Sequence, residues 1–331
     1  MIIPEFESLM NQNDLDVYGS SKLMDFLVSA QSTDSMRAAF LAAMFVKGVK
    51  PEELVGFARA LREKATISRV PGLTDIVGTG GDHKNTVNVS TASSIVCAAL
   101  GVRIGKHGNR ASTGIHGSAD FLEKIGYPFT MTFNQILSKI KNDNFVFILA
   151  NGYNKYFMEF SVVRRKLGFS SVLNYLGPIT NPLDPDTIVI GCTGSDIGKI
   201  YAEVLRRSGK SGCVVFAEDG MDEISPLSPT TLLLHDESTF ELTVYPEELD
   251  LNDIAAEDIS SPDPQKIFSK TLDGIKGKDR KVSKFIAANS APALLLNHLG
   301  NDLGECYEKA LETIDSGKAY EKLKSIGGSN A

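Results

Sequence analysis

The sequence predicts an α/β protein in which a small N-terminal helical domain precedes a larger domain, whose mostly parallel central sheet is flanked by helices. Three observations support this fold class. The first part of the chain shows only helical periodicity, β-branched runs alternate with helical segments from residue 70 onward, and 331 residues suit two domains of ordinary size. We therefore expect a helical domain over residues 1–69 and an α/β domain over residues 70–331.

The helical domain is predicted from two amphipathic segments. Residues 34–45 and 52–62 both place apolar side chains at helical spacing, and Pro51 stands where the second helix would begin. No convincing strand precedes residue 70. This part of the chain should therefore be helical throughout.

Strand and helix candidates alternate in the second domain. The strand candidates cover residues 75–77, 102–104, 145–149, 187–192, 212–216 and 231–234, and residues 240–245 are expected to form an antiparallel edge. The helix candidates cover residues 91–100, 118–125, 133–141, 197–208, 291–299 and 303–316. Such alternation implies a mostly parallel sheet covered on both faces, with a ligand crevice at the carboxyl ends of the strands.

Composition and charge exclude several classes of partner. The net charge is −7 and no block of five like charges occurs, which argues against a nucleic-acid partner. The N-terminal text lacks the pattern of a signal peptide, and no apolar run approaches the length of a membrane span. The four cysteines are scattered without a CxxC pair, as expected for buried thiols in a reducing compartment. These features predict a cytoplasmic protein without a membrane partner.

A glycine-rich motif follows the first strand candidate. Residues 78–82 read GTGGD, and three glycines within four positions let the backbone approach a ligand closely. Residues 88–91 read NVST, and Ser90 and Thr91 are suitable cap residues for the helix that follows. A glycine loop beside a helix N-terminus predicts a cradle for pyrophosphate, the alternative being a tight turn with an ordinary cap. The text matches neither GxGxxG nor GxxxxGK(S/T), which disfavours a dinucleotide-binding fold and a P-loop ATPase.

Two charged clusters follow other strand candidates. Residues 106–110 read KHGNR and place two cations, an amide and an imidazole around one glycine, which suits phosphate and carboxylate recognition; a solvated basic turn is the alternative. Asp222 and Glu223 are adjacent carboxylates after a strand, and such oxygen ligands suit Mg²⁺; a plain surface loop is the alternative. No zinc spacing and no signature of a nucleophilic hydrolase is present.

Taken in order, these motifs resemble those of the anthranilate phosphoribosyltransferases. The series is GTGGD, NVST, KHGNR, GSAD at residues 117–120, LGP-x-x-NP at residues 176–182 and DE-x-S-P at residues 222–226. The resemblance covers nearly the whole chain. It implies a fold of the nucleoside phosphorylase and phosphoribosyltransferase type and a homodimer formed through the N-terminal helices. It also implies transfer of phosphoribose from phosphoribosyl pyrophosphate (PRPP) to the amine of anthranilate in tryptophan biosynthesis, with release of pyrophosphate.

The resemblance assigns roles to the residues that match the family motifs. The expected PRPP-binding residues are Gly78, Thr79, Gly80, Gly81, Asp82, Thr86, Asn88, Val89, Ser90, Thr91, Lys106, His107, Gly108, Asn109 and Ser118. The expected acceptor-binding residues are Gly78, Asn109, Arg164, Gly177 and Pro178. Ser90, Asp222 and Glu223 are expected to serve two magnesium ions. No catalytic base is expected, because an arylamine is already neutral and nucleophilic at pH 7 and the protein has chiefly to align two reactants.

Two segments depart from the family pattern. Asn154-Lys155 stands where the family usually carries a histidine-proline pair, and residues 83–85 (HKN) replace a more glycine-rich loop. A phosphoribosyltransferase acting on a different aromatic acceptor therefore stays open as an alternative. A pyrimidine nucleoside phosphorylase is disfavoured by chain length and by KHGNR, and a nucleic-acid-binding relative of this fold is disfavoured by the acidic charge and the retained motifs.

Overall fold

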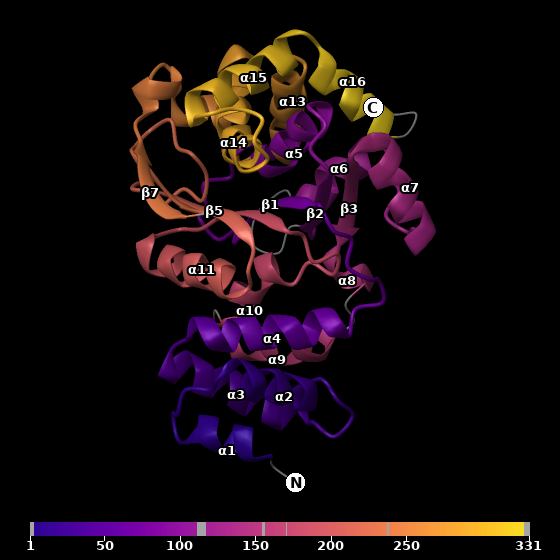
Figure 1. Ribbon diagram of the computed structural model, residues 1–331, viewed down its shortest axis with the longest axis vertical. Helices are drawn as coiled ribbons and strands as arrows, with labels where there is room; N and C mark the ends of the chain where they lie inside the picture. Colours follow the sequence, from indigo (N-terminus) through magenta and orange to yellow (C-terminus); the bar gives the residue numbers. More distant parts are fainter. Residues whose placement is uncertain (1–2, 111–116, 154–155, 170, 237, 328–331) are drawn as a thin grey trace.

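Four helices form the N-terminal end of the molecule. The computed structural model describes residues 3–110, 117–153, 156–169, 171–236 and 238–327. The four helices are α1 (Pro4–Met10), α2 (Val17–Leu27), α3 (Asp34–Lys47) and α4 (Pro51–Glu63), and they lie together at the lower end of Figure 1. Side chains of Asp16 and Thr33 cap α2 and α3, and Pro51 opens α4. The two helices predicted from the sequence are therefore confirmed.

A later segment of the chain completes this helical layer. Helices α9 (Tyr156–Leu167) and α10 (Val172–Leu176) follow the third strand, and α9 packs against α3 in the lower part of Figure 1. Phe160 packs on Phe40 of α3, with ring centroids 6.1 Å apart. Arg37 Nη2 lies 3.2 Å from Glu159 Oε2 across the same junction. Apolar and ionic contacts thus hold this later segment to the N-terminal helices.

A seven-stranded sheet forms the centre of the α/β part. Its strands are β1 (Thr74–Gly78), β2 (Ile104–Gly108), β3 (Phe145–Leu149), β4 (Thr187–Gly191), β5 (Ser211–Ala217), β6 (Thr230–His235) and β7 (Thr239–Val244). Their order is β3-β2-β1-β4-β5-β6-β7; the first five are parallel, and β6 and β7 are antiparallel to their neighbours. The predicted parallel sheet with an antiparallel edge is confirmed. The second strand, however, begins at Ile104 and runs through Gly108, so it includes residues that the sequence placed after the strand.

Helices cover both faces of the sheet. The remaining helices are α5 (Val89–Ala99), α6 (Ser118–Lys124), α7 (Phe133–Asp143), α8 (Ala150–Tyr153), η1 (Gly177–Ile179), α11 (Ser195–Arg207), η2 (Pro246–Leu249), α12 (Ala256–Ile259), α13 (Pro264–Ile275), α14 (Arg280–Leu296), α15 (Leu303–Asp315) and α16 (Lys318–Ile326). In Figure 1, α11 lies between the sheet and the helical layer, whereas α5, α13, α14 and α15 lie on the other side. Along β4, Ile188 and Ile190 enter the core shared with the helical layer, and Val189 enters the opposite core.

All four cysteines are buried free thiols, as predicted. Within the described ranges, no helix combines the length and the apolar character that a membrane span requires.

Candidate active site

The candidate active site lies where the chain changes direction across the sheet. From β1 the chain moves outward through β2 to β3, and it then returns to add β4 and β5 on the other side of β1. A crevice opens at the carboxyl ends of two strands at such a switch point. Gly78 ends β1 and pairs directly with Gly191 at the end of β4. The glycine-rich motif therefore begins at the point where this architecture places a ligand.

Two glycines at the switch point admit the acidic pair. A Cβ atom at Gly78 would lie 2.6 Å from Asp222 Oδ2, and one at Gly191 would lie 1.8 Å from the carbonyl oxygen of Asp222. Both distances are too short for any side chain, so Asp222 can occupy this position only beside glycine. The backbone N–H of Gly80 donates to Asp222 Oδ2 at 3.1 Å. The GTGGD motif and the acidic pair, far apart in sequence, thus form one structure.

The loop after Asp82 adopts a conformation that glycine favours. His83 and Asn85 have φ angles of 57° and 52°, in the left-handed region. Asparagine enters this region more readily than most residues, whereas histidine does so at some cost. The departure from the glycine-rich family pattern at residues 83–85 therefore falls on positions where the backbone conformation is demanding.

A cavity of about 310 Å³ occupies the crevice and brings most of the predicted residues together. The predicted residues that line it are Gly78, Thr79, Gly80, Gly81, Asp82, Thr86, Asn88, Val89, Ser90, Lys106, His107, Gly108, Asn109, Ser118, Asp222 and Glu223. Thr91, Arg164, Gly177 and Pro178 are described by the structure but are not part of this lining. Residues from five separated motifs thus surround one space.

The helix start beside the cavity differs from the prediction. Helix α5 begins at Val89 with Asn88 as its N-cap, so Ser90 and Thr91 lie in the first turn and are not the cap residues. The expectation that they cap the helix is wrong, because the chain enters the helical conformation before them. Thr91 is fully buried, whereas Ser90 faces the cavity. The free N–H groups of this helix end still lie beside the glycine loop, as an anion cradle requires.

Lys106 lies inside β2 and not in a solvated turn. Its side chain is 1% exposed, and its Nζ donates to the carbonyl of Ile76 and to Ser90 Oγ at 3.2 Å. Burial lowers the pKa of Lys106 to about 8, although the nearby carboxylate of Asp75 opposes the shift. Burial raises the pKa of Asp75 to about 6. The lysine is therefore a buried cation with one carboxylate behind it and the cavity in front.

Three carboxyl groups of the cavity lining, those of Asp82, Asp222 and Glu223, lie close together. Burial and then Asp82 raise the pKa of Asp222 to about 7, and burial followed by Asp222 and Asp82 raises the pKa of Glu223 well above its usual value. Thr86 Oγ1 donates to Glu223 Oε1 at 3.3 Å. Buried oxygens of Asp82 and Glu223 (Oδ2 and Oε2) have no hydrogen-bond partner among the described residues. An all-oxygen set with repelling, unsatisfied carboxylates fits a hard divalent cation. By themselves, the described histidine, cysteine, aspartate and glutamate side chains form no metal-holding group of three or more.

Gly78 and Asn109 line the cavity, whereas the other three expected acceptor residues, Arg164, Gly177 and Pro178, do not. Arg164 is exposed on α9, and its Nη2 donates to Asn174 Oδ1 at 3.2 Å. Gly177 and Pro178 form the short turn η1. The imidazole of His107 donates to the carbonyl of Gly177, and burial lowers the pKa of His107 to about 4, so the ring is neutral at pH 7. This contact links strand β2 to the turn η1.

Comparisons with known proteins agree with this geometry. Residues 71–320 match the glycosyl transferase family, a/b domain, and residues 6–65 match the helical bundle domain of the same family. The anthranilate phosphoribosyltransferase of Picrophilus torridus is 45% identical over 294 residues, which cover 88% of this chain and 90% of that protein. The chain belongs to the anthranilate phosphoribosyltransferase family.

Solved structures of this family share the whole fold. The anthranilate phosphoribosyltransferase of Thermus thermophilus superposes with a TM-score of 0.90 at 30% identity, covering 98% of each chain. The Saccharomyces cerevisiae enzyme, solved in complex with PRPP and Mg, has a TM-score of 0.85 at 25% identity and covers 97% of this chain and 95% of its own. The predicted combination of a helical domain with an α/β domain is thus confirmed for this member of the family.

Three residues that support the site were not predicted from the sequence. Asn181 Nδ2 donates to Asp75 Oδ2 at 2.9 Å and to the carbonyl of Gly105 at 2.7 Å. Asn289, from α14, exchanges two hydrogen bonds with the backbone of Ile224 beside the acidic pair. Asn181 stands inside the LGP-x-x-NP motif and Asp75 opens the first strand candidate, so the position of each was a usable signal. Asn289 lies in a helix interior and carried none.

Proposed function

We propose that this protein transfers the phosphoribosyl group of PRPP to the amine of anthranilate, giving N-(5-phosphoribosyl)anthranilate and pyrophosphate, a step of tryptophan biosynthesis. The observation that carries the proposal is the single cavity lined by the GTGGD, NVST, KHGN and acidic motifs. Its chemistry suits a polyanion: glycine-loop N–H groups, a helix N-terminus, a buried lysine and oxygen ligands for a cation. The family name of the relatives supplies the acceptor.

The residues of the cavity fall into two groups, those that would bind the phosphates of PRPP and those that would hold magnesium. Backbone N–H groups of residues 78–82 and of the start of α5 would cradle the pyrophosphate, and Lys106 would pair with phosphate charge. Ser90, Asp222 and Glu223 would hold magnesium, with water and phosphate oxygens completing its shell, and two ions are expected. When bound, magnesium would offset the charge of the pyrophosphate. The presence of Mg with PRPP in the yeast relative supports this assignment.

The acceptor would approach from the side of Asn109 and the turn η1. Asn109 lines the cavity and would meet the acceptor there, with Arg164 as the expected partner of the carboxylate. Since the amine is neutral at pH 7, alignment of the two reactants is the main requirement. The Asn154-Lys155 departure lies outside the described residues. Another aromatic amine is therefore the alternative acceptor.

We also infer a homodimer formed through the helical layer, in the cytoplasm. Three large apolar side chains of α2 and α3 are exposed to water: Tyr18 (71%), Phe45 (60%) and Val46 (70%). Exposed apolar surface of this kind suits a protein–protein interface. Four buried free thiols suit a reducing compartment. Sedimentation equilibrium would test the dimer, and a monomer at micromolar concentration would contradict it.

One assay decides the proposed function. The protein is mixed with PRPP, Mg²⁺ and anthranilate, and the loss of anthranilate fluorescence is followed, with aniline, substituted anilines and benzoates run beside it. Loss that requires both PRPP and Mg²⁺ is the expected result. If another aromatic amine is consumed faster than anthranilate, that amine is the acceptor and PRPP remains the donor. Release of no pyrophosphate with any acceptor would overturn the proposal.

A further inference from the structure

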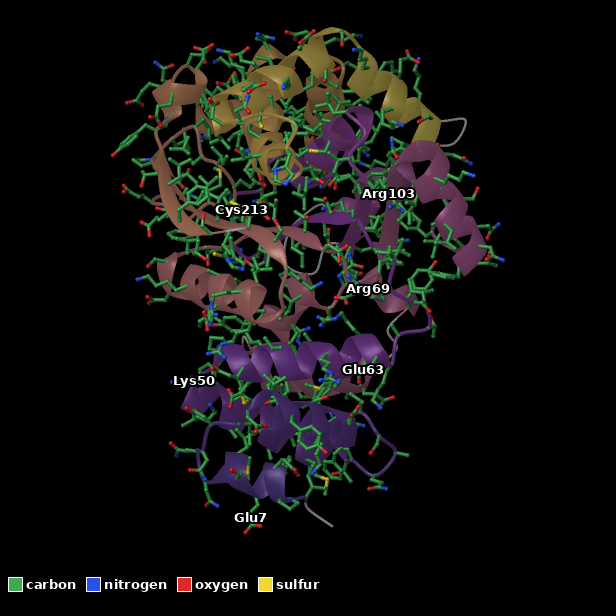
Figure 2. The ribbon with its side chains drawn as sticks, viewed as in Figure 1. Glu7, Lys50, Glu63, Arg69, Arg103 and Cys213 are labelled. Atoms are coloured by element: carbon green, nitrogen blue, oxygen red, sulfur yellow. The ribbon has the colours of Figure 1, made fainter. Side chains whose placement is uncertain are left out.

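A group of opposite charges joins the helical layer to the α/β part of the chain. Asp184 lies on the loop before β4, and cations from three parts of the chain approach its carboxylate. Arg62 Nε and Lys210 Nζ lie 3.2 Å and 2.8 Å from Asp184 Oδ1. Arg69 Nε lies 3.7 Å from Asp184 Oδ2. Figure 2 shows Arg69 just beyond Glu63, the last residue of α4, between the helical layer and the sheet.

Asp184 needs this support because of its backbone. Its φ angle is 47°, in the left-handed region that disfavours residues with a Cβ atom. Pro185 follows it, and a residue before proline is further restricted. The surrounding cations therefore stabilise a strained loop end and, through it, the path of the chain from the turn η1 to β4.

Arg62 differs from the other two cations because it also reaches the acceptor side. Its Nη1 donates to the carbonyl of Ile179 at 2.6 Å, and its side chain is only 17% exposed. Ile179 is the last residue of η1, the turn that contains Gly177 and Pro178. His107 holds the same turn at the carbonyl of Gly177. The turn is thus fixed by β2 at its first residue and by α4 at its last.

We propose that Arg62 is a positioning residue for the aromatic acceptor: it transmits the position of α4 to the turn Gly177–Ile179 and so fixes one wall of the acceptor subsite. This inference rests on the proposed transfer to an aromatic amine and on the expected place of Gly177 and Pro178 beside the acceptor. A guanidinium carries several donors in one plane, so Arg62 serves Asp184 and the Ile179 carbonyl at once. A lysine ends in a single nitrogen, which cannot occupy the positions of both Nε and Nη1, so it cannot reproduce both contacts.

Lys210 provides a matched control for this role. Its Nζ pairs with Asp184 and donates to the carbonyl of Pro185. Lys210→Met therefore removes one cation from Asp184 and one carbonyl contact, as Arg62→Met does, but it leaves η1 untouched. Both variants should lower the melting temperature to a similar extent. Only Arg62→Met should raise the KM for anthranilate, by about 10-fold, the lower end of the range for a lost charged hydrogen bond, while the KM for PRPP stays within about 2-fold.

The outcomes separate this inference from the proposed function. Equal changes in both KM values, or the same change in both methionine variants, would show that Arg62 only stabilises the junction and would overturn the inference. If Arg62→Met does not fold, Arg62→Lys decides: it keeps a cation at Asp184, and the KM for anthranilate should still rise while that for PRPP does not. Failure of the wild-type protein to consume anthranilate would instead overturn the proposed function, and this inference with it.

Discussion

Replacing Lys106 by methionine should weaken the binding of PRPP and leave the acceptor nearly unaffected. Lys106 is 1% exposed and lines the cavity, with its Nζ between Ser90 Oγ and the carbonyl of Ile76. Methionine keeps most of the apolar stem and removes the ammonium group. The substitution therefore isolates the contribution of the charge to phosphate binding.

The magnitude follows from the contacts that Lys106 loses and those that it leaves. A charge-assisted contact to phosphate is worth about 1.5–3 kcal/mol, which corresponds to a rise of about 10- to 150-fold in the Kd for PRPP. The variant also leaves Asp75 buried without its cation. Burial already raises the pKa of Asp75 to about 6 with Lys106 present, so in the variant the carboxyl binds a proton and the loss of folding stability is limited.

Calorimetric titration with magnesium and PRPP measures the Kd, and steady-state kinetics give the KM of each substrate with the other saturating. Lys266→Met, at an exposed position of α13, makes the same change in net charge and should leave both constants unchanged. If the Kd for PRPP in Lys106→Met equals that of the wild type and only the KM for anthranilate rises, Lys106 belongs to another subsite and the reasoning is wrong.

Three further predictions follow from the same site. Asp222→Asn with Glu223→Gln should abolish turnover without unfolding the protein, and near-wild-type rates at low magnesium would refute the metal assignment. Arg164→Ala should raise the KM for anthranilate, because about 2–5 kcal/mol of binding free energy is lost, and should leave the KM values for PRPP and aniline unchanged. An equal rise in the KM for aniline would exclude a contact between Arg164 and the acceptor carboxylate. The folded-state pKa of Asp75, about 6 against 3.8 unfolded, means that this group binds its proton more tightly in the folded protein, so its contribution to stability falls by about 2 kcal/mol between pH 4 and pH 6. Asp75→Asn should remove this decline in urea unfolding, and an unchanged pH slope would contradict the assignment.

The gathering of the glycine-rich and acidic motifs could be predicted because each of these two motifs comes after a strand. Residues 78–82 follow β1 and the acidic pair follows β5, and the carboxyl ends of parallel strands meet at one edge of a sheet. Glycine, cap and carboxylate residues also have strong local signals. The sequence could therefore predict the donor side of the site from short segments and the order of the strands alone.

The placement of Lys106 and His107 inside β2 could not be predicted in the same way. From local sequence alone, a lysine and a histidine beside glycines predict a loop. Here tertiary contacts override that preference and place both residues in a strand. Lys106 is satisfied by the carbonyl of Ile76, Ser90 and the nearby Asp75, and His107 by the carbonyl of Gly177. Contacts of this kind join distant segments and leave no periodic trace in the sequence.

The same long-range contacts make the acceptor turn dependent on the donor side. His107 fixes Gly177, and Asn181, two residues beyond the end of η1, binds the carboxylate that stands behind Lys106. A shift of this turn would therefore displace the partners of the cation proposed to bind phosphate as well as the proposed wall of the acceptor subsite. The proposed reaction needs two aligned reactants and no base. Such coupling is then an advantage, because one rigid connection fixes the donor side and the acceptor side relative to each other. The supporting residues are accordingly buried groups that hold other residues in place: the amides of Asn181 and Asn289, the carboxylate of Asp75 and the neutral imidazole of His107.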